Sequence, residues 1–148
     1  MSELRTEKPP MIVQKELKFA TSGYGSMRDL TQDIASFLRN ARVQSGVAHV
    51  FAIGSTAGIC SIEFEPGLEQ DFPATLSKLI PPRCEYGHEQ TWHDGNGHSH
   101  LQASLVGPDL TIPIRNGELL LGTWQQVIHV EFDIRSRNRE VIVTINGE

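Results

Sequence analysis

The sequence predicts a single α+β domain, built mostly from antiparallel sheet with two main helices. Its length of 148 residues suits one domain. Strand patterns recur along the chain with two helical patterns among them, in an order that does not alternate as a doubly wound α/β fold requires. The hydrophobic fraction of 39% and the charged fraction of 21% are typical of a chain with a packed core. We expect residues 11–148 to form this domain and residues 1–10, which are polar and end in proline, to form a disordered arm.

The first part of the chain predicts two strands separated by a helix. Residues 11–20 alternate apolar and polar side chains, which is typical of a half-buried strand. Ser26 and Asp29 resemble a capping box, so we expect a helix over residues 27–42. Its apolar face would consist of Leu30, Ile34, Phe37, Leu38 and Ala41. Residues 47–53 are nearly all apolar, which predicts a strand in the sheet centre.

The middle of the chain predicts a further strand and two shorter helices. Residues 59–64 have a strand pattern. A second helix is expected over residues 71–79, with Pro73 in its first turn and the Pro81-Pro82 pair after its end. Residues 98–105 could form a short helix that ends at a glycine.

The end of the chain predicts two hairpins. Residues 110–114 and 118–121 flank Asn116-Gly117, and Asn-Gly is the strongest short signal for a hairpin turn. Residues 122–133 and 140–145 would form the second hairpin around a turn rich in arginine. Arg135, Arg137 and Arg139 are then expected at a solvated hairpin end, with an anion-binding rim as the alternative.

Composition excludes several classes of function. A net charge of −5 argues against nucleic acid as a partner, because phosphate binding needs clustered Lys and Arg. No segment has the ~20 apolar residues of a membrane span, and the N-terminus is not a signal peptide. Cys60 and Cys84 are too few for a disulfide framework, so we expect both to be small buried side chains. We therefore expect a cytoplasmic protein.

A histidine-rich segment holds the densest group of reactive side chains. His88, His93, His98 and His100 lie among the polar residues Glu85, Glu89, Asp94 and Asn96. Imidazoles and carboxylates are ligands for zinc and similar divalent metals, so the segment predicts a metal site or a catalytic site. Exposed loop histidines are the alternative. On a helix, His98 and His100 would point about 200° apart, so both could not readily bind one ion.

Two other segments carry candidate site residues. Along the strand of residues 122–133, the side chains of Gln125, His129 and Glu131 share one face, which faces either a site, solvent or a neighbouring subunit. The glycines of residues 54–58 allow backbone amides to converge on an anion, with the hydroxyls of Ser55 and Thr56 as further donors. A tight turn at the sheet edge is the alternative for residues 54–58.

Several strings resemble the YjbQ-like family of small bacterial and archaeal proteins, also called the secondary thiamine-phosphate synthase enzyme family. The matching residues span roughly 11–148, and the most specific string is Leu119-Leu120-Leu121-Gly122-Thr123-Trp124-Gln125. Other matches are Tyr86-x-His88, Asp94-Gly95, residues 100–105, Gly107-Pro108, Thr111-Ile112-Pro113, Glu131 and the closing residues 141–148.

The resemblance implies an α+β fold that assembles as a homotrimer, with pockets near the subunit contacts. It implies that His88, His100, Gln125 and Glu131 line those pockets, that a divalent metal such as zinc binds at the histidines, and that some members make thiamine phosphate weakly. Many relatives have histidine at the position of Gly54, and Glu63 or Glu65 could replace a carboxylate that this chain lacks.

Two hypotheses follow for function. In the first, the chain is an enzyme for a small phosphorylated metabolite, with thiamine-phosphate synthase activity as one option. His88, His100, Glu131 and Gln125 then hold a divalent metal or act as acid and base, and Ser55 and Thr56 bind the phosphate. In the second, a non-catalytic trimer binds a small anionic metabolite in the same pocket. Both expect no nucleic acid and no membrane partner.

Overall fold

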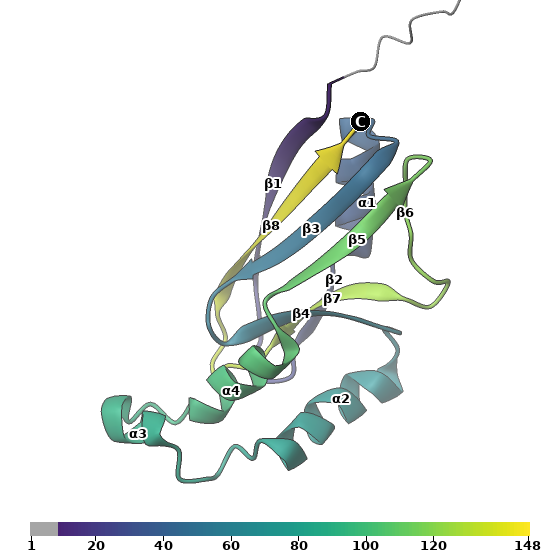
Figure 1. Ribbon diagram of the computed structural model, residues 1–148. Helices are drawn as coiled ribbons and strands as arrows, with labels where there is room; N and C mark the ends of the chain where they lie inside the picture. Colours follow the sequence, from purple (N-terminus) through teal and green to yellow (C-terminus); the bar gives the residue numbers. More distant parts are fainter. Residues whose placement is uncertain (1–8) are drawn as a thin grey trace, which may run out of the picture.

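Two antiparallel sheets organise the chain in the computed structural model, which describes residues 9–148 (Figure 1). In spatial order, the five-stranded sheet consists of β1 (Met11–Ala20), β8 (Asn138–Gly147), β3 (Ser45–Ile53), β5 (Asp109–Arg115) and β6 (Glu118–Leu119). The three-stranded sheet consists of β2 (Met27–Asp29), β7 (Gln126–Glu131) and β4 (Ala57–Ile62). These sheets and their helices confirm the predicted α+β class.

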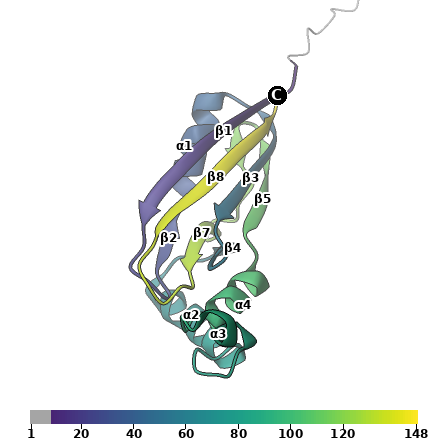
Figure 2. The same ribbon diagram turned by 90° about the vertical axis from the view of Figure 1, so that its left-hand side faces the viewer.

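The helices cover the sheets from two sides. They are α1 (Thr31–Ala41), α2 (Pro66–Leu79), α3 (Gly87–Trp92) and α4 (Gly97–Val106). Helix α1 lies behind the five-stranded sheet in Figure 1, whereas α2, α3 and α4 gather at its lower end, near β4 (Figures 1 and 2). The histidine-rich segment therefore lies at the end of the molecule opposite to the C-terminus.

Strand β7 is buried on both faces because it separates two apolar cores. Val127 belongs to the larger core, which α1 forms with the inner face of the five-stranded sheet. Ile128 and Val130 belong to the smaller core, together with Leu76 of α2 and Ala103 of α4. A side chain at any position of β7 from Val127 onward is therefore enclosed, whichever way it points.

The predicted first helix begins later than expected. Residues Met27–Asp29 pair with β7 as strand β2, and α1 starts only at Thr31. The predicted capping box is wrong for the same reason, because the N-cap residue is Leu30, which makes no side-chain cap. Asp29 instead precedes the N-cap and accepts a hydrogen bond from the Thr31 amide at 2.8 Å. Strand pairing with β7 outweighs the local helix preference here.

The second helix is longer than predicted. It begins at Pro66 instead of Asp71, and Pro73 therefore lies in its interior. Glu65 caps it, because its carboxylate accepts hydrogen bonds from the amides of Gly67 and Leu68 at 2.9 and 2.6 Å. This carboxylate is committed to the start of α2, while Glu63 is exposed. Helix α3, in the histidine-rich segment, was not predicted at all.

Only the first of the two predicted hairpins forms. Strands β5 and β6 pair around Asn116 and Gly117, whose φ angles of 54° and 74° are typical of a type I′ turn. The second hairpin is wrong, because β7 pairs with β2 and β4 whereas β8 pairs with β1 and β3. The arginine-rich segment thus crosses from one sheet to the other.

The Gly117→Ala variant is expected to lose about 1 kcal/mol of unfolding free energy. An alanine would be strained at φ +74°, and its Cβ would lie 3.1 Å from Nε2 of Gln44. Urea denaturation measures the change. The matched control is Gly87→Ala, where a Cβ meets no atom within 4 Å and φ is not positive. Equal stability of Gly117→Ala and the wild type would contradict the turn geometry.

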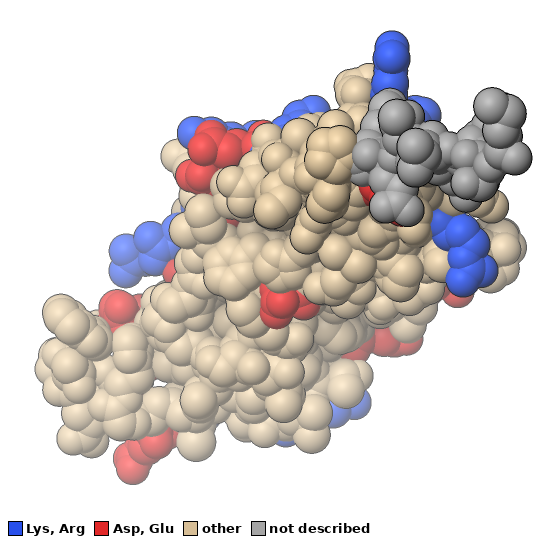
Figure 3. Space-filling view, turned by 45° about the horizontal axis from the view of Figure 1, so that its top comes forward, with Lys and Arg blue, Asp and Glu red and all other residues tan. Residues whose placement is uncertain are grey.

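The surface agrees with the charge balance of the sequence. On the face in Figure 3, Lys and Arg side chains are scattered, several of them beside Asp or Glu, and form no continuous basic area. None of the helices formed by residues 9–148 is long and apolar enough to cross a membrane.

The two cysteines differ in burial. Cys60 is partly buried, and burial raises the pKa of its thiol to about 11. Cys84 is exposed, so its predicted burial is wrong.

Candidate functional site

Two of the clustered histidines come together where α3 packs against α4. The rings of His88 and His100 lie 4.5 Å apart between centroids, with their planes inclined by 49°. Both side chains are partly exposed. His93 is exposed beyond the end of α3. The predicted cluster therefore separates into one close pair and isolated members.

The ring of His88 is held in place by two polar neighbours. Its Nε2 lies 3.2 Å from Oδ1 of Asp94 and 3.0 Å from the side-chain amide of Asn96. The amide is best satisfied when its nitrogen donates to both His88 Nε2 and Asp94 Oδ1, at 3.0 and 2.9 Å. The carboxylate of Glu89 accepts from the amides of Gly95 and Gly97 at 2.7 and 2.6 Å, which fixes the loop between the helices. An imidazole oriented in this way suits proton transfer.

His98 points away from the pair into the protein, as its spacing from His100 predicts. Its side chain is buried, and its Nδ1 has no hydrogen-bond partner in the described part of the chain. Burial lowers the pKa of His98, while the negative charges of Glu89 and Asp133 act in the opposite direction. The ring lies near Tyr24, with centroids 5.9 Å apart. His98 is therefore a neutral interior group near neutral pH.

Glu131 lies at the centre of a separate, buried network. One oxygen accepts hydrogen bonds from Thr21 Oγ1 at 2.8 Å and from Arg139 Nε at 2.7 Å. The other accepts from the Asp133 amide at 2.9 Å and from Nη2 of Arg139. Within residues 9–148, no hydrogen bond or ion pair joins Glu131 to His88 or His100. A solvent-facing polar stripe through His129 and Glu131 is ruled out, since both are buried.

The network extends through Thr56 to a second ion pair. The hydroxyl of Thr56 accepts from Nη2 of Arg139 at 2.7 Å and donates to Oδ2 of Asp133 at 3.1 Å. Arg137 pairs with the same oxygen of Asp133, at 2.8 Å from its Nη2. Burial would raise the pKa of the Asp133 carboxyl, but the hydrogen bonds from Arg137 and Thr56 outweigh it and hold the pKa below its usual value.

This network corrects two expectations from the sequence. Arg139 is not at a solvated hairpin end, because its guanidinium is buried beside Glu131. The hydroxyl of Thr56 is committed to Arg139 and Asp133 inside the protein, whereas Ser55 is exposed. Of the two hydroxyls predicted to meet an anion, Ser55 alone is free to do so in the described part of the chain.

The described residues do not form a three-ligand metal centre. Across residues 9–148, no group of three or more His, Cys, Asp or Glu side chains is placed to hold an ion. His88 and His100 lie together, but both oxygens of Glu131 already accept hydrogen bonds from Arg139. The set His88, His100 and Glu131 therefore does not fit a metal within one chain.

Gln125 shapes a turn instead of joining the other candidates. It precedes β7 and is exposed. Its Oε1 accepts from the Gly122 amide at 3.1 Å, and its Nε2 donates to Ser61 Oγ at 3.1 Å. The side chain therefore ties residues 122–125 to β4.

His129 is a buried imidazole beside an aromatic ring. Among residues 9–148, neither ring nitrogen has a hydrogen-bond partner, and the ring packs edge-on against Phe19 with centroids 4.9 Å apart. Burial, partly offset by the charge of Glu131, lowers the pKa of His129 from 6.5 to about 4. His129 is thus a neutral core residue.

Acidification should therefore destabilise the fold through His129. Below pH 6.5 the unfolded chain takes up a proton at this residue, but the folded chain does so only near pH 4. Neutral His129 therefore contributes fully to the free energy of unfolding above pH 6.5. This contribution falls by roughly 3 kcal/mol as the pH falls to about 4. Urea denaturation between pH 7 and pH 4 measures it. The His129→Leu variant should lack this loss, and an equally steep loss in that variant would contradict the assignment.

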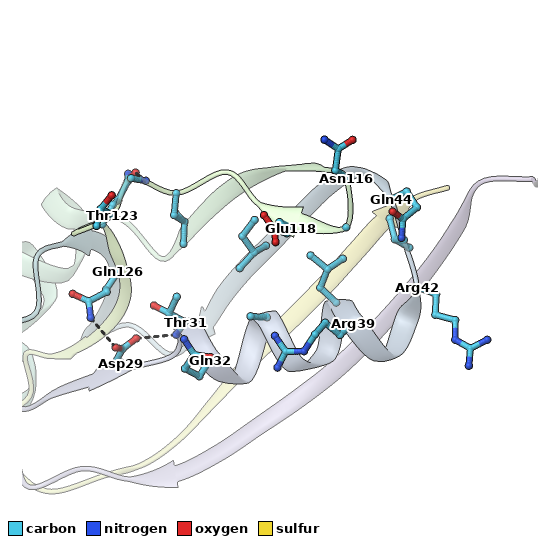
Figure 4. A pocket seen from close by; sticks show the side chains of 18 residues that line it. Asp29, Thr31, Gln32, Arg39, Arg42, Gln44, Asn116, Glu118, Thr123 and Gln126 are labelled. Atoms are coloured by element: carbon cyan, nitrogen blue, oxygen red, sulfur yellow. Dashed lines mark hydrogen bonds between the residues drawn. The ribbon is translucent and has the colours of Figure 1, made fainter.

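A well-formed cavity lies away from the histidine pair. Its volume is about 790 Å³, and it separates α1 from the segment of residues 116–126 (Figure 4). Apolar side chains such as Leu38 and Leu119 line it, with Arg39 and Arg42 toward the C-terminal end of α1. Asp29 and Gln126, which are hydrogen-bonded at 3.3 Å, line its other end. This cavity is a second candidate for ligand binding.

Sequence reasoning named Arg139 and Asn96 but missed their contacts in the site, and it did not name Asp133 as a site residue. Asp133 stands two residues after Glu131, on the same face of the predicted strand, and this spacing was a usable signal. The alternating arginines of residues 135–139 are expected to be solvated from their sequence alone. The burial of Arg139 follows only from the crossing of the chain between the two sheets. Asn96 acts through a loop conformation that residue patterns do not predict.

Comparison with known proteins finds a single family. A family model described as "UPF0047 protein YjbQ-like" matches residues 15–148. A UPF0047 protein of Methanothermobacter thermautotrophicus is 34% identical over 137 residues, which cover 93% of this chain and 94% of that protein. The UPF0047 protein YugU of Bacillus subtilis is 32% identical over 121 residues, covering 80% and 89% respectively.

Solved structures share the fold over nearly the whole chain. A YbjQ-like protein of unknown function from Sulfolobus solfataricus has a TM-score of 0.87 and 29% identity, covering 94% of this chain and 99% of that one. An uncharacterized conserved protein of the yjbq/upf0047 family from Clostridium acetobutylicum has a TM-score of 0.75 and 34% identity, covering 90% and 98%.

Proposed function

The chain belongs to the YjbQ-like UPF0047 family, and we propose that it is an acid–base enzyme for a small phosphorylated metabolite. The observation that carries the proposal is the contact of His88 with His100 beside Asp94 and Asn96. Adjacent imidazoles allow one ring to accept a proton from the substrate while the other donates one. The proposal uses no metal step, since Glu131 is committed to Arg139.

The loop between α3 and α4 lies near Ile134, which follows Asp133 in the chain, and this proximity supports placing both sets of residues in one site. A Cβ on Gly95, in the loop between α3 and α4, would lie 3.8 Å from Ile134, the residue after Asp133. Asp133 in turn contacts Thr56 in the turn between β3 and β4, where Ser55 is exposed. We assign phosphate binding to the Ser55 side of this site and proton transfer to His88 and His100.

Screening for turnover tests this function. The protein is incubated with phosphorylated metabolites, among them the pyrimidine pyrophosphate and thiazole phosphate that thiamine-phosphate synthases join, and products are detected by mass spectrometry. The proposal expects a product for at least one compound that also raises the melting temperature. Stabilisation by several compounds without any product would contradict an enzymatic role.

A non-catalytic binding protein for a small anionic metabolite is the second candidate. The cavity beside α1 favours it, because Arg39 and Arg42 line an otherwise partly apolar space that contains no histidine. A thermal shift by an anionic metabolite, lost in the Arg39→Ala variant and accompanied by no product, would support this candidate. A thermal shift that persists in Arg39→Ala but disappears in His100→Ala would contradict it.

We further propose that the protein works as a homotrimer. The outer face of the five-stranded sheet exposes apolar side chains, among them Val47, Phe51 and Ile53, which alternate with the buried residues of β3. A second copy could bury this surface and cover open sheet edges. Light scattering should give three times the chain mass of 16.5 kDa. A monomer mass at micromolar concentration would contradict the trimer.

A further inference from the structure

The geometry around Arg139 points to an anion subsite, which we propose binds the phosphate or carboxylate group of a small metabolite. Its parts are Nη1 of Arg139, the backbone at Gly54 and the hydroxyl of Ser55. The inference rests on the proposed function for the identity of the metabolite, but the binding of an anion can be tested without turnover.

Arg139 has one nitrogen that is free to bind a ligand. Nε donates to Glu131, and Nη2 donates to both Glu131 and Thr56. Within the described residues, Nη1 has no hydrogen-bond partner, although the side chain is only 8% exposed. Nη1 is not fully enclosed by other atoms of the described chain, so part of it reaches the surface. A rigid, buried guanidinium that presents one nitrogen is preorganised to recognise an oxyanion.

Gly54 leaves the space in front of this nitrogen open. Its φ of +137° is a conformation that side chains rarely adopt, and a Cβ there would lie 2.8 Å from Nη1 of Arg139. A larger residue at this position would therefore crowd the nitrogen. The glycine keeps Nη1 accessible at the point where β3 ends.

The turn after Gly54 supplies further donors. The amides of residues 54–56 donate no hydrogen bond to any backbone group of the described chain. The hydroxyl of Ser55 is exposed and has no partner among residues 9–148. Amides and a hydroxyl next to a guanidinium are the donors that a phosphate oxygen needs.

Charges around the subsite balance, so hydrogen bonding decides its affinity. Arg137 and Arg139 neutralise Asp133 and Glu131. Arg139 also lines a surface cavity of about 430 Å³.

Titration with inorganic phosphate and pyrophosphate, followed by calorimetry, tests the subsite. Ser55→Ala should weaken binding about tenfold, the equivalent of one hydrogen bond to a charged group. Gly54→Ala and Arg139→Lys should weaken it at least as much. Circular dichroism verifies folding of each variant, and Ser55→Ala carries the test if Arg139→Lys does not fold. The matched control is Arg135→Ala, an exposed arginine of the same segment, which should bind as the wild type does.

The outcomes separate this inference from the proposed function. Unchanged phosphate binding in both Ser55→Ala and Gly54→Ala would overturn the subsite, as would loss of binding only in Arg39→Ala. Absence of phosphate and pyrophosphate binding at millimolar concentration would also overturn it. Binding that depends on Ser55 and Gly54, without turnover of any metabolite, would keep the subsite and contradict the enzyme.

Discussion

Replacement of Glu131 by alanine is expected to lower the free energy of unfolding by about 3–5 kcal/mol. The Glu131 carboxylate is fully buried and accepts hydrogen bonds from Arg139, Thr21 and the Asp133 amide. Without it, the guanidinium of Arg139 remains as an uncompensated charge inside the protein, and Thr21 loses its acceptor. Urea denaturation followed by far-ultraviolet circular dichroism measures the loss.

Two further variants test whether the buried pair of Glu131 and Arg139 causes this loss of stability. Asp33→Ala breaks the exposed pair between Arg28 and Asp33, which are 3.5 Å apart, and should change the stability by less than about 1 kcal/mol. The double variant Glu131→Leu with Arg139→Met removes both charges and should be more stable than Glu131→Ala. A loss in Glu131→Ala no larger than that in Asp33→Ala would contradict the role assigned to this pair.

Replacement of His100 by alanine is expected to lower kcat/KM by about 10²- to 10⁴-fold on the metabolite that is turned over. The ring of His100 lies 4.5 Å from that of His88, and the proposed mechanism needs one imidazole to accept a proton and the other to donate one. Because His100 is partly exposed and outside both apolar cores, stability should change little. Steady-state kinetics with product detection measures the effect.

A histidine of the same segment provides the control for His100. His93 is exposed and occupies a left-handed conformation at φ 55°, which asparagine tolerates well, so His93→Asn should fold and retain its rate. Inorganic phosphate should bind to His100→Ala as it does to the wild type, because the anion subsite is formed by other residues. An undiminished rate in His100→Ala would remove the proton-transfer role.

Local sequence patterns predicted those parts of the fold whose signals do not depend on distant contacts. The alternation in β1, the apolar run in β3 and the Asn116-Gly117 turn all correspond to observed elements. The start of α1 was misplaced because residues 27–29 pair with β7, a contact about a hundred residues away in the chain. The expected pairing of β7 with β8 failed for the same reason: turn composition does not determine which sheet a strand enters.

The candidate site was only partly predictable. The residue pattern identified the histidine cluster, and the family resemblance singled out His88 and His100, which do lie together because α3 packs against α4. Glu131 and Thr56 were also identified, but their partner Arg139 was not, since burial of an arginine depends on the carboxylate that the fold places beside it. Sequence patterns indicate which residue types are present, whereas the interior network depends on the crossing between the two sheets.

Nuclear magnetic resonance of the imidazole rings tests the central claim, that ligands act at the pair of His88 and His100, most directly. In protein with labelled histidines, addition of the metabolite found by screening should shift the signals of His88 and His100. The signals of His49, on the outer face of β3, and of the buried His129 should stay in place. If the metabolite leaves both His88 and His100 unshifted while backbone signals around Arg39 and Gln44 move, the ligand binds in the cavity beside α1 and the account is contradicted.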